Sequence, residues 1–147
     1  MLSCEECEQE GKSVAEAAAG KVLIVEDDEY IAELLRYWFS RAGYLTRTVA
    51  DGLAACSMVQ QERPDVILLD LMLPGLDGRE VCRLIRRHGD IRIASIPIIM
   101  LTALSAVEDQ VRGLSLGADL YMPKPYSVRD VLNAVGGLIG RRRDCGG

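Results

Sequence analysis

Several features that would narrow the class of this protein are missing from its 147 residues. No apolar run approaches the ~20 residues that a helix needs to cross a bilayer, and no secretory signal peptide is evident. Basic residues are not in excess: the net charge is -5, which argues against unaided binding to nucleic acid or to an anionic membrane. We therefore expect a cytoplasmic protein that binds neither DNA nor membrane by itself.

The chain has five cysteines, and an odd number cannot pair completely, so the cysteines do not indicate a disulfide framework. Cys56 and Cys82 lie in helical patterns, where a free thiol is usually a small core residue. Cys4 and Cys7 have a spacing found in zinc and redox sites, but zinc requires four ligands and no second close pair exists. We expect reduced thiols, with Cys4 and Cys7 in an N-terminal tail over residues 1–20, which lack a sustained apolar period.

What is present fits one globular domain: apolar content is 49% and charged content is 27%. One apolar run, Val66–Leu69, follows Pro64 and predicts a strand buried on both faces. The run ends at Asp70, and the dipeptides Pro74–Gly75 and Asp77–Gly78 then predict a turn. Asp70 therefore lies at the carboxyl end of a central strand, where open α/β sheets bind ligands. Taken alone, it is more often a turn residue or a helix cap.

The same alternation of strand and helix is found five times along the chain. Strands are expected at 22–25, 45–49, 66–69, 96–103 and 120–122. Each is followed by a helical pattern, at about 31–42, 51–61, 79–87, 107–117 and 127–143. This order predicts a parallel sheet with helices on both faces, joined by right-handed crossovers.

Polar residues follow four of these strands at what would be one edge of the sheet. They are Glu26, Asp27 and Asp28 after the first strand, Asp70 after the third, Thr102 after the fourth and Lys124 after the fifth. Converging carboxylates repel each other, and Mg²⁺ resolves this because it binds a few carboxylates plus waters. Lys124 and Thr102 supply a positive charge and a hydroxyl, which can hold a phosphoryl group in transfer. Asp70 would then be the attacking group and would form an aspartyl phosphate.

Four motifs carry a family resemblance: VLIVEDDE, VILLDLMLPGLDG, IPIIMLTA and GADLYMPKPY. They resemble the response-regulator receiver domain of two-component signalling. The resemblance covers about residues 21–142 and leaves 143–147 as a C-terminal tail or the start of a linker. It implies a flavodoxin-like (CheY-like) α/β fold, a five-stranded parallel sheet of order 2-1-3-4-5 with five helices on both faces.

The resemblance also implies which residues handle the phosphoryl group. Asp70 corresponds to the phosphoacceptor, and Thr102 and Lys124 correspond to the pair that grips the phosphoryl group. Tyr121 matches the aromatic residue that changes rotamer when Thr102 moves. The peptide bond between Lys124 and Pro125 is expected to be cis.

For the metal, the resemblance implies a Mg²⁺ site built around the same aspartate, Asp70. Asp27 resembles the direct ligand, and Glu26 resembles the acidic partner that often acts through water. Met72 would give its backbone carbonyl, and Asp28 lies outside the pair.

The expected function is a phosphorylation-dependent switch, not a metabolic enzyme, although the domain would assist its own phosphorylation and dephosphorylation. A histidine kinase or phosphotransfer protein would donate the phosphoryl group to Asp70. The face formed by the fourth helix, fifth strand and fifth helix would then bind a downstream protein or a second copy. Met72 and Leu104 would flank the phosphoryl group and offer no group to orient water, so self-hydrolysis should be slow.

Three other interpretations remain beside the switch. In the first interpretation, the chain is the receiver half of a DNA-binding regulator cut at its linker, although nothing after Asp144 could form a helix-turn-helix. A haloacid-dehalogenase-like phosphatase would carry a second Asp where this chain has Met72. A scaffold that cannot be phosphorylated is disfavoured because no site residue is missing.

Overall fold

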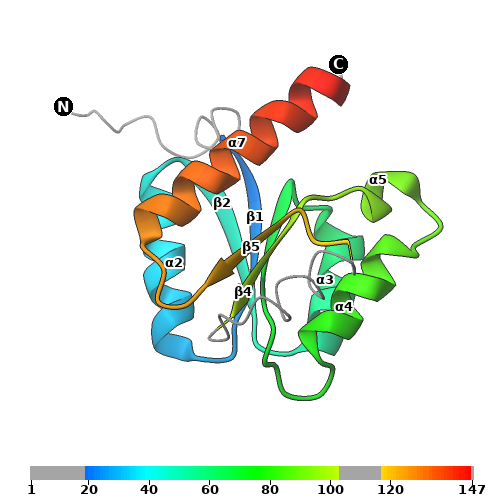
Figure 1. Ribbon diagram of the computed structural model, residues 1–147, viewed down its shortest axis with the longest axis horizontal. Coiled ribbons are helices and arrows are strands. Elements are labelled where there is room, and N and C mark those ends of the chain that lie inside the picture. Colours follow the sequence, from blue (N-terminus) through cyan, green and yellow to red (C-terminus); the bar gives the residue numbers. More distant parts are fainter. Residues whose placement is uncertain (1–18, 103–116, 147) are drawn as a thin grey trace.

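The computed structural model describes residues 19–102 and 117–146. Five parallel strands form one sheet in the order β2-β1-β3-β4-β5, which is the predicted order (Figure 1). The strands are β1 (Gly20–Val25), β2 (Tyr44–Val49), β3 (Val66–Asp70), β4 (Ile98–Thr102) and β5 (Leu120–Pro123). The described helices are α2 (Glu29–Arg41), α3 (Gly52–Glu62), α4 (Gly78–Arg86), α5 (Ile91–Ala94) and α7 (Val128–Gly146).

The helices cover both faces of the sheet, with α2 and α7 on one face and α3, α4 and α5 on the other. Successive strand residues point to opposite faces. Ile67 and Leu69 therefore pack with α3 and α4, whereas Val66 and Leu68 pack with α2 and α7. All four are fully buried, as the apolar run predicted. Burial of each such side chain is worth about 1.5–3 kcal/mol, so β3 anchors both layers of the core.

The strand register brings the polar residues to one edge. Val25 of β1 pairs with Leu69 of β3, so the residues that follow them, Glu26 and Asp70, leave neighbouring strands side by side. Thr102, the last residue of β4, pairs with Pro123 of β5, directly before Lys124. The edge predicted from the sequence is therefore formed.

Three boundaries differ from the prediction. β1 begins at Gly20, where the tail was expected to end, because Gly20 already pairs with Tyr44 of β2. β4 begins at Ile98, two residues later than expected, after Pro97, which has no N–H to donate to a ladder. α7 continues to Gly146, so the tail expected at 143–147 is helical up to that residue. The arginines before it are good helix formers and no proline interrupts them.

One described helix, α5, was not predicted. It is a single turn capped by the carboxylate of Asp90, which accepts from the backbone N of Arg92 at 2.9 Å. The helix expected at 107–117 falls outside the described residues except for Gly117, as do Leu104, Cys4 and Cys7. Among the described helices, none has the length and apolar content needed to cross a membrane.

Candidate functional site

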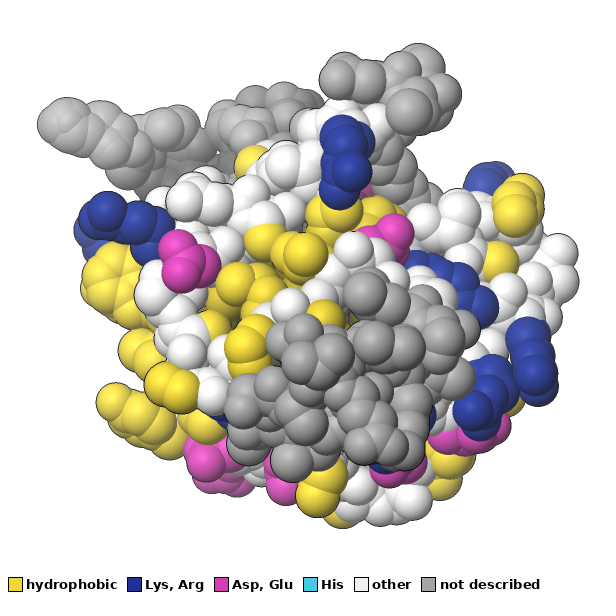
Figure 2. Space-filling view, viewed as in Figure 1, with side chains coloured by type: hydrophobic (Ala, Val, Ile, Leu, Met, Phe, Trp, Pro, Cys, Tyr) yellow, Lys and Arg dark blue, Asp and Glu magenta, His cyan; other side chains and the backbone are white. Residues whose placement is uncertain are grey.

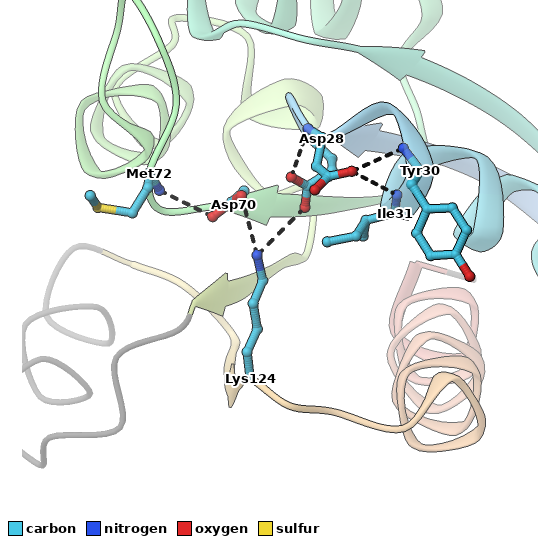
Figure 3. A network of polar contacts seen from close by, with 7 residues as sticks. Asp28, Tyr30, Ile31, Asp70, Met72 and Lys124 are labelled. Carbon is cyan, nitrogen blue, oxygen red and sulfur yellow. Dashed lines mark hydrogen bonds and ion pairs between the residues drawn. The ribbon is translucent and has the colours of Figure 1, made fainter.

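Asp70 is the last residue of β3 and is only 4% exposed. Both oxygens of its carboxylate are engaged (Figure 3). Oδ1 accepts a hydrogen bond from the backbone N of Met72 at 3.1 Å, and Oδ2 accepts one from Lys124 Nζ at 3.4 Å. Lys124 follows β5 and points across the sheet edge toward Asp70. Two segments that are 54 residues apart in the chain thus meet at one carboxylate.

Glu26 and Asp27 complete an acidic cluster with Asp70. One carboxylate oxygen from each of the three residues lies within 4.8 Å of the others. Glu26 is buried and Asp27 is exposed, so the cluster has a closed side and a side open to solvent. Glu26 Oε2 accepts from the backbone N of Asp28 at 3.1 Å. Its Oε1 is buried and has no hydrogen-bond partner among the described residues, with Lys124 Nζ at 3.7 Å.

Asp28 lies outside the cluster and holds its loop in place. Its side chain caps α2 by accepting from the backbone N of Tyr30 at 2.9 Å and of Ile31 at 3.2 Å. A cap of this kind is worth about 1 kcal/mol. Because the backbone N of Asp28 also donates to Glu26, the start of α2 fixes the acidic side chains at the sheet edge. The sequence placed Asp28 outside the metal pair but did not reveal this role.

The negative charge of the cluster exceeds what Lys124 offsets. The pKa of Glu26 is raised from 4.5 to about 7, chiefly by burial and further by the neighbouring Asp70 charge, although the backbone N–H of Asp28 opposes this. The pKa of Tyr126 is raised to about 12 by burial and by the charges of Glu26 and Asp70. Three carboxylates, one with a buried oxygen lacking a hydrogen bond, are a donor set that suits a hard divalent cation such as Mg²⁺.

Two glycines allow the close packing around Asp70. A Cβ on Gly78 would lie 2.4 Å from the backbone oxygen of Asp70, and one on Gly52 would lie 2.4 Å from the backbone oxygen of Leu76. The starts of α3 and α4 therefore approach the loop after β3 more closely than any other residue type allows. The sequence indicated a turn at Asp77–Gly78 but not this close approach.

The remaining predicted residues are placed as follows. Thr102 ends β4 at the correct edge, and its side chain lies outside what the structure describes. The hydroxyl of Tyr121 is buried without a hydrogen-bond partner among the described residues. The Lys124–Pro125 peptide bond is cis, as expected. Met72 contributes its backbone N–H to Asp70, and its side chain is 63% exposed.

This fold and site define a flavodoxin-like α/β domain that carries an acidic cluster and a lysine at the carboxyl edge of its sheet. The family model for the response regulator receiver domain matches residues 22–136. The chain belongs to this family and is the receiver domain of a response regulator.

Individual proteins agree with this assignment. The chain is 41% identical over 123 residues to "Response regulator MprA" of Mycobacterium ulcerans, covering 84% of this chain and 51% of that protein. It thus spans about half the length of the curated relatives it matches. The receiver domain of the Francisella response regulator 1452 superposes with a TM-score of 0.77 at 33% identity, covering 83% of this chain and 98% of that one. The receiver domain of sensor histidine kinase PA1611 from Pseudomonas aeruginosa superposes with a TM-score of 0.75 at 32% identity, covering 84% and 99%.

Proposed function

We propose that Asp70 is the phosphoacceptor of a Mg²⁺-dependent signalling switch. The observation that carries the proposal is the convergence at one sheet edge of three carboxylates, with oxygens within 4.8 Å, and of Lys124, 3.4 Å from Asp70. Electrostatic stabilisation and positioning dominate phosphoryl transfer, and this edge supplies both signs of charge in a partly buried setting.

The proposed Mg²⁺ ligands are the side chains of Glu26, Asp27 and Asp70 and the backbone carbonyl of Met72. The receiver domain of PA1611 was crystallised with a magnesium ion in its active site cleft, which supports the same ion here. When bound, Mg²⁺ offsets negative charge between the carboxylates and the incoming phosphoryl group. Glu26 gives the site a buried acceptor whose Oε1 has no hydrogen bond from the described residues, while the exposed Asp27 leaves the site accessible from solvent.

The residues of this chain have separate tasks in the transfer. An oxygen of Asp70 attacks phosphorus in line, so that an O–P bond forms while the N–P bond of a phosphohistidine breaks and its electron pair returns to the imidazole. Lys124 moves its contact from Asp70 to a phosphoryl oxygen and balances the added charge. Thr102 supplies a hydroxyl donor, and Tyr121 changes rotamer when Thr102 moves toward the phosphoryl group. The protein assists its own phosphorylation and dephosphorylation and acts as a switch, not as a metabolic enzyme.

The proposed partners are a histidine kinase or phosphotransfer protein as donor, and a downstream protein or second copy as reader, in the cytoplasm. The reader would bind the face that includes β5 and the following helix α7. Tyr121 supports this placement because it lies on β5 with a buried hydroxyl that has no hydrogen-bond partner among the described residues, and such a group gains a partner if the face repacks.

Incubation with acetyl phosphate and Mg²⁺, followed by intact-protein mass spectrometry, tests the assignment of Asp70. We expect the mass to rise by one phosphoryl group, with the label on Asp70 and no label in EDTA. Asp70→Asn should remove the label. Asp77→Asn is the matched control, because Asp77 is an exposed helix cap near Asp70 and Asn also caps helices well. Labelling of Asp70→Asn at the wild-type site and rate would refute the assignment.

The length of the curated relatives favours a second candidate function, in which this domain is the phosphorylated part of a longer, DNA-binding regulator. The curated relatives are about twice as long as the matched region. Gel filtration with and without beryllofluoride and Mg²⁺ separates the two candidates. A shift to dimer supports a homodimerising output regulator, and no shift supports a single-domain messenger that docks on another protein.

A further inference from the structure

A groove lies between α3, α4 and α5, on the face of the sheet opposite α2 and α7. It has a volume of about 210 Å³ and is lined by Cys56 and Gln60 of α3, Leu84 of α4, His88 shortly after α4, and Ile93 of α5. We call it the α3–α5 groove. Leu84 is 44% exposed, and Ile91, the first residue of α5, is 73% exposed. The groove is therefore a partly apolar surface that the described residues do not cover.

The end of the α3–α5 groove is basic in a protein whose net charge is -5. Arg63 and Arg92 both pair with one carboxylate, that of Asp90, at 3.3 Å and 3.2 Å. Arg87, next to His88, is exposed and has no ion pair among the described residues. Two arginines thus share one aspartate and a third has no ion-pair partner among the described residues, and dark-blue side chains gather over α4 and α5 in Figure 2. The surface favours an occupant that is acidic.

The described chain enters the sheet at its amino edge, the edge on which the basic end of the groove lies; a Cβ on Gly20 would lie 2.8 Å from Ile139 of α7 and 3.3 Å from Asp65. Gly20 is the first residue of β1, and the backbone N of Lys21 donates to Asp65 at 2.8 Å. Asp65 lies two residues after Arg63, at the basic end of the groove. Eighteen residues precede Ala19, and an extended chain spans about 3.3 Å per residue, so residues 1–18 can reach any part of the groove.

The composition of residues 1–18 matches the groove. The segment contains five glutamates, four of them within Glu5–Glu10, and Lys12 as its one basic side chain. Met1 and Leu2 stand at its far end and supply apolar side chains. A tethered segment binds its own domain at a high effective concentration, so weak exposed charge pairs suffice to hold it.

We propose that residues 1–18 dock in the α3–α5 groove, with Glu5–Glu10 on Arg63, Arg87 and Arg92 and the Met1–Leu2 end over Leu84. The groove lies at the carboxyl ends of α3 and α4, which is the amino end of the strands, whereas Asp70 lies at the opposite edge. The docking is therefore independent of the proposed phosphoryl chemistry.

Cys56 provides a native reporter for this docking, because it lines the groove. Burial raises the pKa of its thiol, so that alkylation is slow enough to be timed. In the full chain, the variant with Glu5, Glu6, Glu8 and Glu10 all changed to Gln should alkylate at Cys56 at least about three-fold faster than wild type. High salt, at ~1 M, should have the same effect on wild type because charge pairs are then screened.

Cys82 is the internal control, since it is fully buried on the same face and reports opening of the fold. Its alkylation should stay slow in every variant. Arg87→Glu should also expose Cys56, while Arg36→Glu on α2, on the other face, should not. Mg²⁺ binding should be unchanged in all of these proteins.

Two results would overturn the proposal. One is an equal rate of Cys56 alkylation in wild type and in the glutamate variant, with Cys82 protected in both. The other is protection of Cys56 that rises with protein concentration, since this would assign the groove to a second copy. Amide NMR spectra of the full chain give an independent readout: the glutamate variant should shift the resonances of Gln60, Leu84 and His88 and leave those of α7 in place.

Discussion

The buried carboxyl of Glu26 predicts a specific pH dependence of stability in the metal-free protein. Its pKa is raised in the folded state from 4.5 to about 7. The neutral form is therefore favoured on folding, and this contribution is fully present below pH 4.5 and is lost as the pH rises through about 7. The full difference corresponds to about 3 kcal/mol, and Lys124 and nearby solvent reduce it, so we expect about 1–3 kcal/mol. Glu26→Gln keeps the shape of the side chain and cannot ionise.

The assay is urea unfolding in EDTA at a series of pH values between 5 and 8. The free energy of unfolding of wild type should fall relative to that of Glu26→Gln across this range. Glu29→Gln is the matched control, because it removes an exposed carboxylate three residues along the chain and should retain the wild-type trend. Parallel curves for wild type and Glu26→Gln would refute the reasoning, since Glu26 would then ionise in the folded state as easily as in the unfolded chain.

Three further predictions concern packing and lifetime. Gly78→Ala should lower stability by about 1–3 kcal/mol, because its Cβ would lie 2.4 Å from the backbone oxygen of Asp70; a wild-type urea midpoint would contradict this. Arg86→Met should cost about 2–4 kcal/mol, because the guanidinium donates to three backbone carbonyls and one carboxylate that tie α4 to α5 and to the segments directly before β4 and β5; an unchanged thermal midpoint would be the contrary result. Met72→Asn with Leu104→Glu should speed loss of the phosphoryl group after acetyl phosphate is removed, and equal decay rates would disprove the proposed role of these apolar side chains.

The sheet could be predicted because parallel strands buried on both faces leave continuous apolar runs. Val66–Leu69 is such a run, and all four residues are fully buried. The polar residue that ends each run then marks the carboxyl edge, which is why Glu26, Asp70 and Lys124 could be brought together from the sequence. A helix cap can also be read from the sequence: Asp51 accepts from the backbone N of Ala54 and caps α3, at the start of the helix predicted at about 51–61.

Features that depend on tertiary packing could not be predicted. The single turn α5 is too short to show a helical period, and its start depends on the side chain of Asp90. Glu26 and Asp27 are adjacent in the sequence, and the sequence does not predict which of them is buried. The register of β1 against β3 determines that Glu26 is the buried one. The close approach of Gly78 to the backbone of Asp70 is likewise a property of packed elements, not of the local sequence.

The most direct test of the central claim is a Mg²⁺ titration of the full chain followed by amide NMR. We expect saturable shifts at Glu26, Asp27, Asp70 and Met72, complete at millimolar Mg²⁺ and absent in Asp27→Asn. Amides at the amino end of the sheet, such as Lys21, should not move. Spectra that stay unchanged at these four residues would contradict the assignment of this sheet edge as the metal and phosphoryl site.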